Sequence, residues 1–125
     1  MEASSPLERT GAKRLGDAGE RASAERVCPD FHAAVELIGK RWAGAILWAL
    51  APGPLYFAEI AHVVPGLSDR LLSQRLRELE AEGLVDRAVH PGTPPRVSYC
   101  LTDKGHELEP AIRELGDWAK RWKVA

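Results

Sequence analysis

Polar side chains recur at intervals of three and four residues in the middle of the chain: Arg70, Ser73, Gln74 and Arg77. On an α-helix this spacing places them along one face. Arginine can donate two hydrogen bonds to guanine and glutamine can bond adenine in the same way, while serine is short enough to reach a phosphate or a base edge. The chemistry that these side chains could perform together is the reading of base edges in the major groove of DNA.

A helix of about residues 69–82 is predicted to position these groups. Its leucines fall on the side opposite to the polar face, so that side should be buried. Ser68 is the expected N-cap, because its hydroxyl can accept a first-turn N–H, and it joins the candidate DNA contacts; Gly83 is the expected C-cap. Three glutamates make the far end of the helix acidic, which indicates that its first half meets the DNA: Glu78, Glu80 and Glu82.

The segments on either side of this helix predict a winged helix-turn-helix. Apolar periodicity indicates helices near 30–38, 42–50 and 57–64, with a short strand at 55–56 and a Pro-Gly break before Ser68. Strand-like runs at 84–90 and 96–101 should form a hairpin, and a last helix, with Thr102 as its expected N-cap, should cover 103–122. The expected fold is therefore mainly α with a small β-hairpin wing (α+β), in which Arg96 marks the wing and contacts DNA.

The composition sets bounds on this interpretation. The chain has 125 residues, a net charge of −1 and two cysteines. It should form a single domain over 27–125 after a disordered tail at 1–26. The net charge is not basic enough to indicate nucleic-acid binding, so a DNA-binding function must be argued from the local arrangement of the side chains. We expect a cytoplasmic protein without membrane, metal site or cofactor, since no segment has the length or spacing that these require.

The apolar stripe of the last helix suggests a dimer. Leu115, Trp118 and Trp122 share one face at the end of a short chain, where little protein remains to cover them. A second copy would bury them, and dimeric DNA readers bind two related half-sites. Packing within one chain is the alternative.

Cys28 is the candidate redox residue, because it directly precedes Pro29 and the helix dipole there would stabilise a thiolate. An inert packing role is the alternative, and the nearby Asp30 favours it. Cys28 and His32 also have the spacing of a nucleophile and its base. The sequence offers neither an orienting group nor an oxyanion donor, so we expect no enzyme.

Four stretches of the chain together resemble the HxlR-type winged-helix regulators, a family related to the MarR-like fold: CPDFHAAVELIGKRW (28–42), FAEIAHVVPGLSDRLLSQRLRELEAEGLVDR (57–87), PPRVSYCLT (94–102) and LTDKGHELEP (101–110). The resemblance implies a homodimer that packs through its first and last helices, including Phe31, on a pseudo-palindromic operator of double-stranded DNA. It also implies an effector. Some such regulators resemble thiol sensors with a cysteine at the position of Cys28, and others respond to small molecules.

The sequence departs from the family pattern at two places. The family tends to have R-F-N-E-L-R-R where this chain has YFAEIAH at 56–62, which removes most of the positive charge. Lys40 stands where glycine is usual, and Ala43 and Gly44 replace larger residues. These small residues could open a ligand pocket between the first, second and last helices, lined by Trp42 and Trp48.

Taken together, the sequence predicts a sequence-specific DNA-binding transcriptional regulator, a repressor, that responds to an oxidant or electrophile or to a small molecule. The alternative is a winged helix that binds other proteins and has no DNA function.

Overall fold

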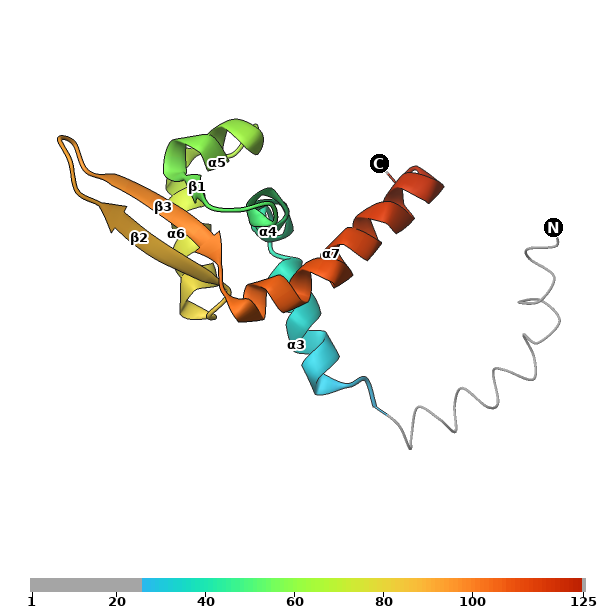
Figure 1. Cartoon of the computed structure of the whole chain (residues 1–125). Helices are drawn as coiled ribbons and strands as arrows, with labels where there is room; N and C mark the ends of the chain where they lie inside the picture. The colour runs from blue at the N-terminus through green and yellow to red at the C-terminus, as the bar shows by residue number, and fades with distance from the viewer. Residues whose placement is uncertain (1–25, 125) are drawn as a thin grey trace, which may run out of the picture. The chain divides into compact units, whose positions relative to one another are not determined.

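The computed structural model describes residues 26–124, which divide into two parts, 26–35 and 36–124, each described by itself (Figure 1). Of the predicted disordered tail at 1–26, all but Arg26 lies outside the described residues. The elements follow the predicted order: α3 (Pro29–Ile38), α4 (Ala43–Leu50), β1 (Leu55–Tyr56), α5 (Phe57–Val63), α6 (Asp69–Ala81), β2 (Val85–His90), β3 (Arg96–Leu101) and α7 (Asp103–Trp122).

Proline and serine or threonine set the helix starts. Pro29 opens α3, where its missing N–H costs no hydrogen bond. The predicted N-caps of the two longest helices are confirmed: the Ser68 hydroxyl accepts from the Leu71 N–H of α6, and the Thr102 hydroxyl accepts from the Gly105 N–H of α7. At the other end of α6 the helix stops one residue before the prediction, with Glu82 as C-cap and Gly83 at a φ of 77°.

The sheet has three antiparallel strands in the order β1-β3-β2. The hairpin of β2 and β3 was predicted, with Val85 opposite Leu101 and His90 opposite Arg96. The short strand β1 was also predicted. It pairs with the edge of β3 that does not face β2, so that Tyr56 lies opposite Ser98. This pairing ties the segment before α5 to the wing, as Figure 1 shows.

The core of the second part lies where α4, α5 and α6 meet the sheet. The almost wholly apolar α4 is central, with Ile46 and Leu50 fully buried. The predicted apolar face of α6 is confirmed, since Leu72, Leu76 and Leu79 are at most 1% exposed. Burial of each such leucine contributes about 1.5–3 kcal/mol, which fixes the rotation of α6 and therefore the direction of its polar face. No helix within residues 26–124 has the length and apolar character needed to cross a bilayer.

Candidate nucleic-acid interface

The polar face of α6 lies on the solvent side, opposite its buried leucines. Arg70, Gln74 and Arg77 are exposed and Ser73 is half-buried, while Ser68 caps the helix at its start. The structure thus brings five of the predicted DNA contacts together on the first three turns of one helix and its cap. Asp69 is the acidic residue of the first turn, where its negative charge interacts favourably with the positive end of the helix dipole.

Two of these side chains are hydrogen-bonded within their own helix. The Arg77 guanidinium donates to the Ser73 hydroxyl at 2.9 Å, and the Gln74 amide donates to the Glu78 carboxylate at 3.3 Å. The Arg70 side chain differs from them, since within residues 26–124 it makes neither a hydrogen bond nor an ion pair. All of the donors of Arg70 are free for a ligand, whereas Gln74 and Arg77 must exchange a bond to meet a base.

A third arginine of α6, Arg75, faces the protein instead of the solvent. Its Nε donates to the Arg41 carbonyl oxygen at 2.9 Å, and its Nη1 lies 3.2 Å from the Glu78 carboxylate, which Lys40 also approaches at 3.5 Å. Burial alone would raise the pKa of Glu78, but the hydrogen bond from Gln74 and the charges of Lys40 and Arg75 outweigh it and hold that pKa below its ordinary value. Arg75 and Glu78 therefore anchor α6 to the loop before α4.

Sequence reasoning missed this anchor. Arg75 follows Gln74 directly in the sequence. It adds the same positive charge to this segment as Arg70 and Arg77 do, so charge alone does not distinguish it from them. The signal was its place on the helix wheel, next to the leucine face rather than opposite to it.

At the wing, Arg96 lies against an aromatic ring. Its guanidinium carbon is 3.5 Å from the centre of the Tyr56 ring, and the His90 ring meets the same tyrosine edge-on at 5.6 Å. His90 Nε2 and the Ser98 hydroxyl are 2.7 Å apart. The structure thus places the predicted wing residue Arg96 beside the segment that leads into α5, and Tyr56 is a second residue that sequence reasoning did not assign.

The residues predicted for the dimer interface are exposed in both parts. In residues 26–35 the Phe31 side chain is 63% exposed. In residues 36–124, Leu115, Trp118 and Trp122 lie on one face of α7 and are 47–70% exposed. Contiguous apolar surface of this kind is typical of a face that a partner covers.

The two cysteines are free thiols in different parts of the chain. Cys28 is exposed and directly precedes α3, where its carbonyl oxygen accepts from the His32 N–H at 3.0 Å. Cys100 is half-buried on β3 and shares the strand face of Ser98. Within residues 26–124 no group of three or more His, Cys, Asp or Glu side chains is arranged to hold a metal ion.

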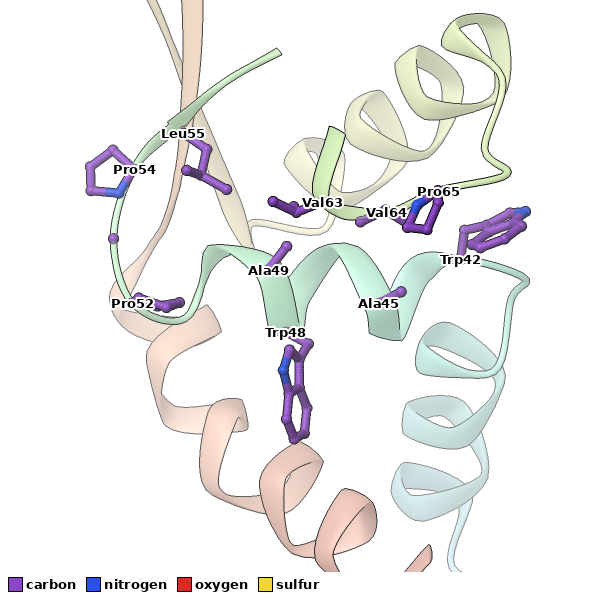
Figure 2. Close-up of a pocket in the computed structure, with 11 residues that line it drawn as sticks. Trp42, Ala45, Trp48, Ala49, Pro52, Pro54, Leu55, Val63, Val64 and Pro65 are labelled. Carbon is purple, nitrogen blue, oxygen red and sulfur yellow. The ribbon is translucent and has the colours of Figure 1, made fainter. Parts of the chain in front are cut away.

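An apolar groove of about 800 Å³ runs along α4, and Figure 2 shows its lining. Trp42 and Trp48 both belong to the lining, but this groove lies at a different place from the predicted pocket. All lining residues lie between Trp42 and Pro65, so the groove lies between α4, the loop to β1 and the end of α5, not beside the last helix. Ala43 and Gly44 are not part of its lining; the small residues in its wall are Ala45, Ala49 and Gly53.

The Trp48 ring is turned away from most of this groove. Figure 2 shows it pointing from α4 toward α7, and a methyl group placed on Gly116 would overlap it. The Arg113 guanidinium lies 5.3 Å from the centre of the same ring. Trp48 therefore belongs mainly to the contact between α4 and α7, and Trp42 is the indole that the groove presents.

A capped helix with an exposed Arg/Gln face, preceded by a short helix and a tight turn and followed by a two-stranded hairpin, defines a winged helix-turn-helix DNA-binding protein. The model of the HxlR-like helix-turn-helix family matches residues 37–125, and the chain belongs to that family. It is accordingly a transcription regulator and not an enzyme.

The relatives agree with this assignment. The chain is 48% identical over 96 residues to the uncharacterized regulator YvaP of Bacillus subtilis, covering 77% of this chain and 89% of YvaP. It is 42% identical to YodB of the same organism, covering 77% and 86%. The reduced form of YodB superimposes with a TM-score of 0.68 over 76% of this chain and 93% of that structure.

Other solved relatives are described as treated with diamide, bound to quinone or redox regulators. YodB has also been solved after diamide treatment, with a TM-score of 0.66, 41% identity and coverage of 78% and 96%. A quinone-bound form of YodB gives a TM-score of 0.66 at 39% identity, covering 75% and 99%. The redox regulator HypR in its reduced form gives a TM-score of 0.72 at 33% identity, covering 76% and 94%.

Proposed function

We propose that this protein is a sequence-specific repressor in the cytoplasm that binds a pseudo-palindromic operator as a homodimer. In this proposal the first half of α6 enters the major groove and the wing follows the DNA backbone. The observation that carries it is the exposed face of Arg70, Gln74 and Arg77, held outward by fully buried leucines on the other side of the same helix. The acidic C-terminal half of α6 would point away from the phosphates.

Dimer formation through the terminal helices supports the same proposal. Leu115, Trp118 and Trp122 form a stripe along the second half of α7, and Phe31 is a further exposed apolar residue on α3. Two copies that shared such a surface would present two α6 helices, which is the arrangement that a two-fold symmetric operator requires.

We expect the protein to retain duplex DNA from the region upstream of its own gene at about 50 mM salt and to lose affinity steeply toward about 200 mM. Fluorescence anisotropy across a salt series measures this, and the stoichiometry should be two chains per duplex. A wild-type protein that retained no duplex at low salt, while still folded, would sink the DNA proposal. It would favour a winged helix that binds other proteins.

For the effector we propose a thiol mechanism at Cys28. Support comes from the exposure of this cysteine ahead of α3 and from relatives solved in diamide-treated and quinone-bound forms. A small apolar molecule in the groove beside Trp42 is the second candidate, because the groove wall includes Val64 and Pro65, which directly precede the turn into α6.

Cys28→Ser should abolish the change in DNA affinity that diamide or a quinone produces, while the affinity of the untreated protein stays the same. Cys100→Ser is the matched control, since it removes the other thiol of the chain and should leave the response intact. The measurement is anisotropy with and without oxidant. If Cys28→Ser still responds in full, the thiol mechanism is wrong; quenching of Trp42 fluorescence by apolar compounds would then test the groove.

A further inference from the structure

The wing arginine is held in place by contacts that use none of its hydrogen-bond donors. The Arg96 guanidinium is stacked at 3.5 Å over the Tyr56 ring, while the side chain as a whole is exposed. Within residues 26–124 Arg96 has no carboxylate within 4.0 Å and no hydrogen bond from its guanidinium. A stacked guanidinium keeps its N–H groups at the edge of its plane, where they remain free for an anion.

Tyr56 is itself fixed from several sides. Its strand β1 pairs with β3 opposite Ser98, and its backbone N–H donates to the Glu59 carboxylate at 2.8 Å, at the start of α5. The His90 ring packs against the phenol ring in a T-shaped arrangement, with the ring centres 5.6 Å apart, and its Nε2 lies 2.7 Å from the Ser98 hydroxyl. The half-buried phenol ring is therefore a rigid platform that joins the helix-turn-helix to the wing.

We infer that Tyr56 is a positioning residue for DNA binding, which holds the Arg96 guanidinium ready to take a backbone phosphate of the duplex. This inference rests on the proposed function and adds a residue and a ligand group to it. A free arginine side chain loses much rotational freedom when it binds a ligand. Because stacking already restricts the Arg96 side chain before binding, less conformational entropy is lost in the binding step. It also places one cation beside YFAEIAH (56–62), the segment that is otherwise poor in positive charge.

Phosphate is the group that this geometry favours over a base edge. Arg96 stands at the first residue of β3, opposite His90, and lies over the residue that precedes α5, not on the exposed face of α6. A contact to phosphate carries no sequence information, so its effect should be the same on any duplex. A mixed-sequence duplex is therefore a sufficient probe.

The experiment measures affinity for a fluorescein-labelled mixed-sequence duplex at about 50 mM salt. Arg96→Ala should weaken binding about tenfold, and Tyr56→Leu, which removes the ring, about threefold. Tyr56→Phe, which keeps the ring, should bind like wild type. Because the tyrosine acts only through the arginine, the double variant Tyr56→Leu/Arg96→Ala should bind no more weakly than Arg96→Ala alone.

A purely structural role for Tyr56 would show different results. Losses that add in the double variant, or a Tyr56→Leu variant that binds like wild type, would overturn the inference. If Tyr56→Leu does not fold, the stacking is measured on wild type by NMR, where the ring should shift the Arg96 side-chain protons upfield relative to those of the exposed Arg70, which has no ring contact within the described residues; an absent shift also overturns the inference.

The failure of this inference is separable from the failure of the proposed function. If Arg70→Ala weakens binding and Arg96→Ala does not, α6 binds DNA and only the inference about the wing is wrong. If the wild-type protein binds no duplex, both are wrong.

Discussion

Arg70→Ala should reduce affinity for the operator by about one to two orders of magnitude, because a bidentate contact of arginine to guanine discriminates by about 1–3 kcal/mol. Arg70 is the strongest candidate for such a contact. It lies in the first turn of α6, it is exposed, and within the described residues it has no partner that must first be displaced. Arg77→Ala should cost less, since Arg77 gives up its bond to Ser73 in order to bind.

The matched control is Arg113→Ala. It removes one positive charge from an exposed position of α7, where Arg113 pairs with Glu109 at 2.8 Å. Competition binding with specific and mixed-sequence duplexes measures both variants. We expect Arg113→Ala to stay within about twofold of wild type, as is usual for a charge remote from the contacts. Equal losses for the two variants would mean that only net charge matters and that α6 does not read bases.

The elements of this fold could be predicted because their signals are local. The helix 103–122 follows from Thr102 as cap and a stripe at helical spacing, and α6 follows from Ser68 and its leucines; both starts are confirmed. The hairpin follows from two strand-like runs separated by a proline-rich turn. In each case the deciding residues lie within a few positions of one another, so a pattern in the sequence contains them all.

The relations between distant residues could not be predicted in this way. Arg75 is recognised as an anchor only when the Arg41 carbonyl, 34 residues away in sequence, is seen to accept from it. The stacking of Arg96 on Tyr56 likewise depends on the pairing of β1 with β3. The groove was not predicted for the same reason: its wall combines α4 with the end of α5, whereas the sequence suggested only that small residues lay near Trp42.

The first turn of α7 packs so closely on the sheet that Gly105 should admit no side chain. A methyl group there would overlap the Leu84 carbonyl oxygen and crowd the Leu101 side chain. That carbonyl cannot easily move, because it accepts from the Thr102 N–H at 3.0 Å and belongs to the backbone that enters β2. Gly105→Ala should therefore lower the free energy of unfolding by about 3 kcal/mol, the upper part of the range for overpacking.

Gly116→Ala provides the matched control in the same helix. The methyl group would also meet a neighbour there, but that neighbour is the Trp48 ring, a side chain 41% exposed that can turn toward solvent. Alanine also favours a helix over glycine by about 1 kcal/mol, which offsets the contact. Denaturant unfolding should thus show a large loss for Gly105→Ala and a change within about 1 kcal/mol for Gly116→Ala. Similar losses for both would mean that helix α7 as a whole tolerates alanine poorly, and that its approach to Leu84 is not what excludes a side chain at Gly105.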